Sequence, residues 1–276
     1  MAGLFSSQVT PTERRKAFRD GLNSGKIQKF PGAFSPLVAR AIQEAGFDGV
    51  YVSGAVVAAD LALPDIGLTT LSEVAHRSRQ IARVTDLPVL VDADTGFGEP
   101  MSAARTISEF EDAGVAGCHL EDQVNPKRCG HLDGKEVVPT ELMLRRITAA
   151  VNERRDDQFV ICARTDAAGV EGIDAAIERA KAYADAGADL IFTEALHTPA
   201  DFEKFRAAVD VPLLANMTEF GKSELLSAQQ LEELGFNAVI YPVTTLRIAM
   251  GQVEEALAEI AATGTQTGWV DRMQHR

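Results

Sequence analysis

One short pattern occurs four times along the 276 residues and limits the folds open to this chain. In each copy an alanine or leucine precedes a glycine, and a hydrophobic run begins within two or three residues of that glycine. Glycine suits the left-handed position just after a helix, and the hydrophobic run suits a strand. The copies lie at residues 45–52, 113–120, 186–192 and 234–241. The pattern therefore predicts helix-to-strand connections along most of the chain.

Three further hydrophobic runs lie between these copies. Each is nearly continuous and ends on a polar residue, which is typical of parallel strands buried on both faces. The runs are residues 87–92, 159–164 and 211–216, and residues 26–30 form a weaker candidate. The sequence therefore predicts eight strands.

The segments between the strands have the periodicity of amphipathic helices. In residues 101–113 the apolar side chains recur on one helical face, and Pro100 suits the first helical position. Residues 36–45 and 172–186 show the same pattern. Eight strands alternating with helices predict an α/β fold, a single-domain (β/α)8 barrel of the TIM type over residues 1–276. A doubly wound open sheet is the alternative.

Charge and cysteine content narrow the classes of function. The formal net charge of -13 argues against nucleic acid or an anionic membrane as the main partner, but it allows an anionic small molecule. The three cysteines match no zinc spacing and cannot all pair, which indicates a reducing, cytoplasmic setting. The first residues lack the apolar core of a signal peptide, and no run is as long as a membrane span. We therefore expect a soluble protein with a small-molecule partner.

Polar side chains follow almost every predicted strand. Because the active sites of α/β barrels form at the carboxyl ends of the strands, we expect these side chains to meet in one site. They are Ser53, Asp92, Asp94, Glu121, Asp122, Arg164, Asp166, Glu194, Asn216 and, after the last strand, Arg247.

Asp92 and Asp94 form the candidate metal site. Two aspartates separated by one residue at a strand end point to the same side. Carboxylates are ligands that Mg²⁺ or Mn²⁺ prefers. Glu121 and Asp122 are expected to extend this acidic cluster from the neighbouring strand. The alternative is a helix-capping aspartate with a solvated neighbour.

Cys129 is the candidate reactive group. It lies in a polar loop between Lys127-Arg128 and Gly130-His131. Cationic neighbours lower the pKa of a thiol, and a glycine beside it lets a ligand approach the backbone. The other two cysteines lie in hydrophobic runs and are expected to be structural. The alternative for Cys129 is an exposed thiol without a role.

Further groups point to chemistry on carboxylates. The guanidinium of Arg164 suits a carboxylate, although a structural ion pair with Asp166 or Glu194 is the alternative. Ser-Gly-Ala at residues 53–55 predicts a backbone cradle for a ligand. No P-loop, dinucleotide-binding glycine motif or nucleophile elbow is present. A metal, several cations and an acidic thiol together indicate a polycarboxylate substrate and an enolate intermediate.

These motifs resemble the isocitrate lyase/phosphoenolpyruvate mutase superfamily. The matching stretches are residues 51–54, 63–65, 91–98, 121–123, 127–131, 163–166, 170–179, 216–221 and 264–266. They occur in order and cover nearly the whole chain. The loop at residues 127–131 is specific to the carbon–carbon lyases of the superfamily. Chain length and residues 216–221 favour the branch that cleaves 2-methylisocitrate over the longer isocitrate lyases.

The resemblance implies a Mg²⁺-dependent lyase, with Mn²⁺ as a possible substitute, in the methylcitrate cycle of propionate catabolism. It would split 2-methylisocitrate into pyruvate and succinate by retro-aldol cleavage, with Cys129 as the general acid that protonates the succinate enolate. The base would be Tyr51 or a carboxylate near the metal. It also implies a homotetramer that exchanges C-terminal helices. A sibling lyase or decarboxylase acting on 2,3-dimethylmalate, isocitrate or oxaloacetate is the alternative.

The resemblance also assigns individual residues. The catalytic residues would be Cys129, Tyr51, Arg164 and Glu194. The metal would be held by Asp92 and Asp94, with Asp65 and Glu121 in the next layer around it. The substrate would contact Ser53, Gly54, Ala55, Cys129, Gly130, His131, Arg164, Glu194, Asn216, Met217, Thr218, Arg247 and Arg276.

Overall fold

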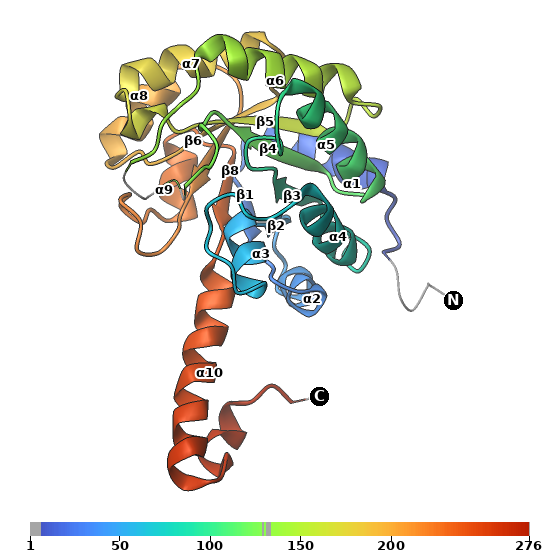
Figure 1. Cartoon of the computed structure of the whole chain (residues 1–276), viewed down its shortest axis with the longest axis vertical. Coiled ribbons are helices and arrows are strands. Elements are labelled where there is room, and N and C mark those ends of the chain that lie inside the picture. The colour runs from blue at the N-terminus through green and yellow to red at the C-terminus, as the bar shows by residue number, and fades with distance from the viewer. Residues whose placement is uncertain (1–6, 129, 131–133, 276) are drawn as a thin grey trace.

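Eight parallel strands form the centre of the computed structural model, which describes residues 7–128, 130 and 134–275 (Figure 1). The strands are β1 (Gln28–Pro31), β2 (Val50–Val52), β3 (Val89–Asp92), β4 (Gly117–Glu121), β5 (Val160–Thr165), β6 (Leu190–Thr193), β7 (Leu213–Asn216) and β8 (Ala238–Tyr241). The sheet order is β1-β8-β7-β6-β5-β4-β3-β2. A parallel bridge between Gly32 and Tyr51 joins the two end strands. The predicted (β/α)8 barrel is therefore confirmed, and the open-sheet alternative is wrong.

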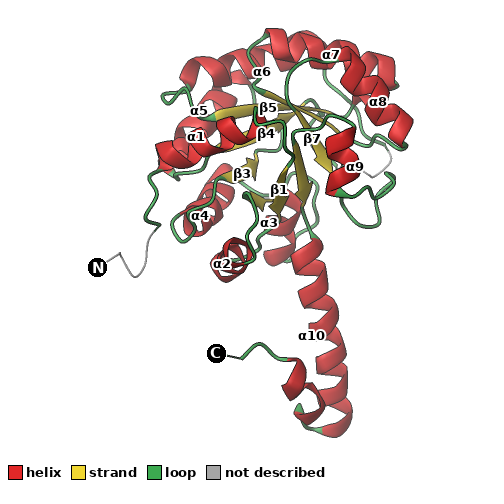
Figure 2. Cartoon of the chain, turned by 180° about the vertical axis from the view of Figure 1, so that it is seen from behind, coloured by secondary structure: helices red, strands yellow, loops and turns green. Residues whose placement is uncertain are grey.

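Helices surround the barrel and connect its strands (Figures 1 and 2). They are α1 (Pro11–Leu22), α2 (Pro36–Glu44), α3 (Gly54–Asp60), α4 (Leu71–Ala82), α5 (Pro100–Asp112), α6 (Thr140–Glu153), α7 (Ile173–Asp185), α8 (Pro199–Ala208), α9 (Ala228–Glu233) and α10 (Thr244–Thr263). Two 3-10 helices, η1 (Ala167–Gly169) and η2 (Thr267–Arg272), follow β5 and α10. No helix in these residues is both long and apolar enough to cross a membrane.

The repeated glycine pattern marks the ends of four helices, as predicted. Gly46, Gly114, Gly187 and Gly235 have φ values of 78°, 78°, 103° and 80°. A residue with a Cβ is strained in this region, so glycine allows the chain to leave the helix and enter the next strand. Short sequence signals also mark where helices begin, because Thr10 and Thr70 each form a capping box with a glutamate three residues later.

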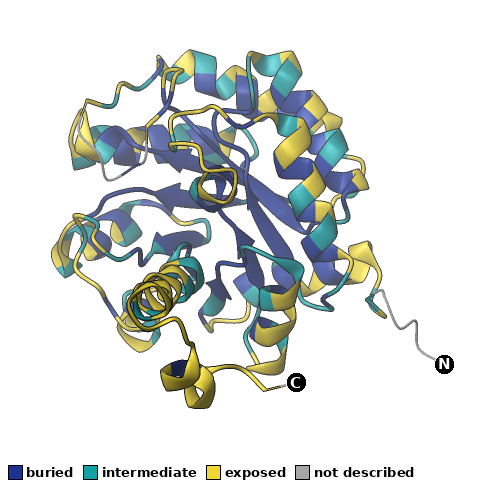
Figure 3. Cartoon of the chain, turned by 60° about the horizontal axis from the view of Figure 1, so that its bottom comes forward, coloured by how far each residue is buried: buried dark blue, intermediate teal, exposed yellow. Residues whose placement is uncertain are grey.

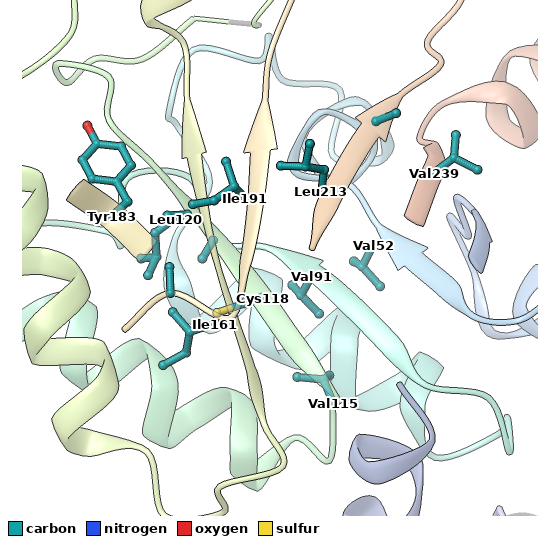
Figure 4. Packing of buried hydrophobic residues seen from close by; sticks show 14 of the residues in the cluster. Val52, Val91, Val115, Cys118, Leu120, Ile161, Tyr183, Ile191, Leu213 and Val239 are labelled. Atoms are coloured by element: carbon teal, nitrogen blue, oxygen red, sulfur yellow. The ribbon is translucent and has the colours of Figure 1, made fainter. Parts of the chain in front are cut away.

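The hydrophobic core has two parts, and strand alternation separates them. On β5, Val160 and Cys162 belong to the cluster inside the barrel, whereas Ile161 and Ala163 belong to the cluster between strands and helices. Figure 4 shows part of this outer cluster. The next inward position on β5 is Arg164, so the same alternation that fills the barrel also directs polar side chains into its carboxyl end.

Helix α10 differs from the other helices in its surroundings. It extends away from the barrel (Figures 1 and 2), and none of its residues is buried (Figure 3). Several large apolar side chains on it are open to solvent, including Ile248 at 64% exposure and Leu257 at 59%.

Candidate active site

The carboxyl ends of the strands surround a cavity of about 440 Å³, a volume that includes space open to solvent. Most of the site residues predicted from the sequence line it, namely Tyr51, Ser53, Ala55, Asp65, Asp92, Gly130, Arg164, Glu194, Asn216 and Thr218. Their side chains come from six different strands or the loops after them, which is the usual arrangement of a site in a barrel.

Asp92 and Asp94 converge beside Gly54, as their spacing predicts. The Gly54 N–H donates to Asp92 Oδ2 at 3.1 Å, and the Asp94 N–H donates to Asp92 Oδ1 at 3.0 Å. A Cβ added at residue 54 would lie 3.0 Å from Asp92 Oδ2 and 3.1 Å from Asp94 Oδ1. Glycine at this position therefore lets the first turn of α3 approach both carboxylates.

Lys127 enters this acidic cluster from the loop after β4. Its ammonium lies 2.5 Å from Asp65 Oδ1 and 2.7 Å from Asp94 Oδ1, and the residue is buried. Burial opposes the charged form, but the surrounding Glu121, Asp94, Asp92 and Asp65 carboxylates raise the pKa of Lys127. The ammonium is therefore charged and bound within the acidic cluster.

The acidic cluster holds more carboxyl groups than its described cationic neighbours keep ionised. Burial and the adjacent Asp92 raise the pKa of Asp94 to about 6. Burial also raises the pKa of Glu121 well above its usual value, although Arg164 favours the carboxylate. Glu121 Oε1 is buried and has no hydrogen-bond partner in the described part of the chain. An added cation would relieve this imbalance.

The donor set suits a hard divalent cation held partly by water. Within residues 7–128, 130 and 134–275, no group of three or more His, Cys, Asp or Glu side chains is arranged to hold a metal by itself. Mg²⁺ commonly binds through one or two carboxylates and completes its shell with water and substrate oxygens. Asp92 and Asp94, with their oxygens converging beside Gly54, fit that requirement.

Arg164 contacts three buried carboxylates. It donates to Asp166 from Nε at 2.9 Å and from Nη2 at 3.1 Å, and it lies 3.3 Å from both Glu121 and Glu194. Its guanidinium carbon lies 5.0 Å from the centre of the Phe192 ring. Arg164 thus forms the structural ion pairs considered from the sequence and also lines the cavity.

Gly130 packs directly against this arginine. A Cβ at residue 130 would overlap Arg164 Nη2 and the side chain of Glu194. The backbone after position 129 can therefore reach the cavity only because residue 130 has no side chain.

Tyr51 is paired with a histidine that the sequence analysis missed. Its hydroxyl lies 2.7 Å from His119 Nε2, and the two rings are stacked with their centroids 5.9 Å apart. His119 Nε2 also lies 3.6 Å from Asp92 Oδ1. Burial lowers the pKa of His119 to about 4 and raises the pKa of Tyr51 well above its usual value, so both groups are neutral near pH 7. One signal was available, because His119 precedes Glu121 by two positions and so shares its inward face.

Asn216 and Thr218 extend the cavity wall beyond β7. The Asn216 amide donates to the two Glu194 oxygens at 3.4 and 3.2 Å. Arg247, at the start of α10, approaches Thr218 Oγ1 at 3.4 Å and pairs with Glu219 at 2.8 Å. This places Arg247 at the rim of the cavity.

Met217 has a different position from its neighbours. Its side chain packs in the outer core, and its sulfur accepts a hydrogen bond from the Leu226 N–H at 3.2 Å.

The expectation that Asp122 extends the acidic cluster is wrong. Successive residues of a strand face opposite sides, so Glu121 points into the barrel and Asp122 points out of it. Asp122 instead accepts hydrogen bonds from Thr165 and Tyr183 in the layer between strands and helices. Cys129, His131 and Arg276 lie outside the described residues, so their assigned roles stay predictions.

Known proteins are similar to this chain in both sequence and fold. A family model described as phosphoenolpyruvate phosphomutase matches residues 18–261. A protein of Corynebacterium glutamicum named probable 2-methylisocitrate lyase 2 is 85% identical over 276 residues, covering 100% of this chain and 90% of that protein.

Two solved structures add to this comparison. The 2,3-dimethylmalate lyase, in its trigonal crystal form, has a TM-score of 0.91 and 35% identity, covering 97% of this chain and 89% of that one. A phosphonopyruvate hydrolase in complex with oxalate and Mg²⁺ has a TM-score of 0.86 and 30% identity, covering 95% of this chain and 92% of that one.

Proposed function

The chain belongs to the phosphoenolpyruvate phosphomutase family and is a carbon–carbon lyase, and from this premise we propose that it cleaves 2-methylisocitrate into pyruvate and succinate. The observation that carries the proposal is the cavity itself, which Arg164 and Asp92 both line, with Asp94 directly beside Asp92. A cation site and a guanidinium on one cavity suit a substrate with several carboxylates.

In this proposal the cavity binds the substrate through a small set of polar side chains. Arg164 attracts a substrate carboxylate, and Glu194 and Asp166 hold its guanidinium in place. Ser53, Asn216 and Thr218 offer further hydrogen bonds to carboxylate or hydroxyl oxygens. Their position at the ends of different strands fixes the substrate on several sides, which favours one orientation of the bond that breaks.

Tyr51 is proposed to take part in removing the substrate hydroxyl proton. Its oxygen can accept that proton while its own proton passes to His119 Nε2, which lies 2.7 Å away. A neutral imidazole has the free lone pair that this transfer needs. A carboxylate of the acidic cluster is the other candidate for the base.

Loss of the hydroxyl proton allows the carbon–carbon bond to break. The alkoxide becomes the keto group of pyruvate, and the electron pair of the broken bond stays on the succinate fragment as an enolate. Arg164 stabilises the negative charge on the enolate oxygens. Cys129 is proposed to donate its thiol proton to the carbon, which completes succinate.

A divalent cation, Mg²⁺ in this proposal, would be held by Asp92 and Asp94 and supported by Asp65 and Glu121. When bound, it supplies Lewis-acid stabilisation of negative charge on substrate oxygens. The raised pKa of Asp94 and the unpaired oxygen of Glu121 support a cation at this position.

We further propose a cytoplasmic homotetramer in which α10 is exchanged between subunits. The exposed apolar side chains of α10, such as Ile248 and Leu257, support a partner for this helix. The buried Cys118 and Cys162 are free thiols, which supports a reducing compartment. Sedimentation of the purified protein tests the assembly, and a monomer at micromolar concentration would contradict it.

Pyruvate release from 2-methylisocitrate, with isocitrate assayed in parallel, tests the reaction. Each acid is assayed with Mg²⁺ and with EDTA. We expect metal-dependent pyruvate release and little glyoxylate. Comparable glyoxylate from isocitrate would indicate a dual enzyme, and no product from either acid would refute the proposed substrate.

A lyase acting on 2,3-dimethylmalate is the second candidate. The high structural similarity to 2,3-dimethylmalate lyase favours it, because the two barrels share most of their length. Values of kcat/KM for the two acids, measured side by side, separate these candidates. A larger value for 2,3-dimethylmalate would reverse the assignment.

The role of Cys129 can be tested separately. The Cys129→Ser variant should lower kcat by about 10³-fold, because a hydroxyl is a much weaker acid than a thiol. Substrate affinity should change little, since the bound substrate keeps its other contacts. A near-normal kcat would remove Cys129 from the acid role.

A further inference from the structure

A buried polar cluster lies directly behind the cavity, in the layer between the strands and α7. Its members are Asp122 after β4, Thr165 at the end of β5, and Arg179 and Tyr183 of α7. All four are buried. None of them lines the cavity.

Asp122 holds the turn that follows β5. Its Oδ1 accepts a hydrogen bond from the Asp166 N–H at 2.9 Å, and its Oδ2 accepts one from the Thr165 hydroxyl at 2.8 Å. The two residues that follow Arg164 in the chain are thus bound to one carboxylate from the neighbouring strand.

The carboxylate of Asp166, which lies in this turn, binds the guanidinium of Arg164. Its two oxygens accept hydrogen bonds from Arg164 Nε at 2.9 Å and Nη2 at 3.1 Å, and Lys135 Nζ lies 2.8 Å from Oδ1. This two-point contact fixes the plane of the guanidinium as well as its position. The orientation of Arg164 therefore depends on where the backbone of Asp166 lies.

Tyr183 and Arg179 hold Asp122 from the side of α7. The Tyr183 hydroxyl donates to Asp122 Oδ2 at 2.9 Å, and Arg179 Nη1 donates to the Tyr183 oxygen at 3.2 Å. Arg179 Nη1 also lies 3.7 Å from Asp122 Oδ2, and Glu171 accepts from the opposite edge of the guanidinium. Figure 4 shows Tyr183 among the residues of the outer core.

We propose that Asp122, supported by Tyr183, is a positioning residue for Arg164 and acts through the backbone and carboxylate of Asp166. The inference rests on the proposed function only in that Arg164 acts on a bound carboxylate or enolate. Asp122 controls the angle at which the guanidinium meets the substrate, while the positive charge itself stays in the cavity. A tilted Arg164 still attracts an anionic substrate, but it stabilises the transition state less well.

The expected kinetic signature is a loss in kcat that exceeds any change in KM. Asp122→Asn leaves one acceptor oxygen for three donors, and we expect kcat to fall about 30-fold with KM changed by less than about 3-fold. Tyr183→Phe removes one hydrogen bond and keeps the ring, so kcat should fall about 5-fold. A purely structural role would lower the unfolding temperature and leave kcat per folded enzyme unchanged.

Glu111→Gln is the matched control for the charge and burial of Asp122. Glu111 is also a buried carboxylate that accepts from two backbone N–H groups and an arginine side chain, but it contacts Arg155 and Asp156 outside the cavity. Its variant should lose stability and keep kcat. If Glu111→Gln lowered kcat as much as Asp122→Asn does, the proposal would be overturned.

A double-mutant comparison tests the route through Asp166. In an Asp166→Asn background the link between the turn and Arg164 is already weakened, so adding Tyr183→Phe should lower kcat by less than about 2-fold. Fully independent effects of the two substitutions would mean that Tyr183 does not act through Asp166.

Crystal structures of the wild type and Tyr183→Phe decide the positioning role without reference to any substrate. We expect the Arg164–Asp166 contact to lengthen or the guanidinium plane to rotate in the variant, and an unchanged Arg164 would overturn the proposal. If the wild type failed to cleave 2-methylisocitrate, the proposed substrate would fall, and these structures would still test the positioning role.

Discussion

The two ends of the barrel use buried charge in different ways. At the amino end, Arg15 of α1 donates to the Val115 and Glu111 carbonyls at 3.0 and 2.9 Å and pairs with Asp156 at 2.8 Å. Arg14 likewise donates to backbone carbonyls, including that of Thr85 at 2.8 Å. These arginines tie separate loops together through backbone carbonyl oxygens and, for Arg15, through one carboxylate of opposite charge.

The carboxyl end instead gathers carboxylates that repel one another. The raised pKa values of Asp94 and Glu121 result from burial and from neighbouring acids. Keeping such groups together costs folding free energy, which a bound cation or substrate can recover. The comparison indicates that the amino end stabilises the fold, whereas the carboxyl end is arranged for ligands.

Removing Asp92 should produce the largest effect at the carboxyl end. Asp92→Ala should lower turnover about 10³-fold or more and abolish its dependence on Mg²⁺, because a proposed metal ligand is lost. The loss of stability should be small by comparison, because relief of repulsion among the acids offsets the two backbone hydrogen bonds that Asp92 accepts from Gly54 and Asp94. Calorimetric titration of Mg²⁺ provides the second measurement, and unchanged Mg²⁺ affinity would place the metal elsewhere.

Removing Arg15 should have the opposite effect, a loss of stability with little change in turnover. Arg15→Ala removes the side-chain donor to the Val115 carbonyl and the ion pair with Asp156, and it leaves the Glu111 carbonyl with the Gly114 N–H alone. The free energy of unfolding should therefore fall by about 2–3 kcal/mol. Denaturant unfolding measures this loss, while kcat at 25 °C should stay within about 2-fold of the wild type. A large fall in kcat without a loss of stability would contradict the division between the two ends.

Lys127 offers a sharper test within the acidic cluster. Its ammonium contacts Asp65 and Asp94, so we expect it to compete with a divalent cation for the same oxygens. Lys127→Met should raise Mg²⁺ affinity about 10-fold, measured by calorimetry without substrate. Lys16→Met, at an exposed i,i+4 ion pair, is the control and should have no effect. Weaker Mg²⁺ binding by Lys127→Met would show that the lysine supports the site instead.

The smallest expected effect is a pH dependence of stability without Mg²⁺. Asp94 has a pKa of about 6 in the fold and 3.8 as its ordinary value, so the folded state holds the proton more tightly. The fold is therefore penalised as the pH rises from about 4 through 6. Raising the pH from 5 to 7 should cost about 1 kcal/mol through this group. Thermal unfolding of the wild type and Asp94→Asn checks this, and equal pH dependence of the two would exclude Asp94 as the cause.

Much of the fold and part of the site could be predicted from local sequence patterns. Glycines after helices and continuous apolar runs act within a few residues, so they identify the strands and their order of alternation with helices. Polar residues at or just after strand ends, such as Asp92, Arg164 and Glu194, could then be assigned to one cavity. The alternation of strand residues also predicts that Asp122 points out of the barrel. Because Asp122 follows Glu121 in the sequence, it was wrongly assigned to the acidic cluster inside.

The remaining features depend on pairs of residues that are far apart in the chain. His119 lies within an apolar run on the inward face of its strand, and that position did not reveal its contact with Tyr51 of a different strand. Tyr183 belongs to the apolar stripe of α7, and nothing local to it indicates a hydrogen bond to Asp122. The buried ion pair of Lys127 joins it to Asp65 across 62 positions.

The sequence by itself determined the barrel and the polar residues at the carboxyl ends of its strands, including the acids and Arg164. These features follow from burial and backbone geometry over short spans of the chain. Tertiary structure decided which carboxylate contacts which cationic side chain. Sheet register places Arg164 between Glu121 and Glu194 and leaves Asp122 on the outer face. Buried charges act over a few ångströms in space, whatever their separation in sequence, so their partners are defined only once the strands are paired.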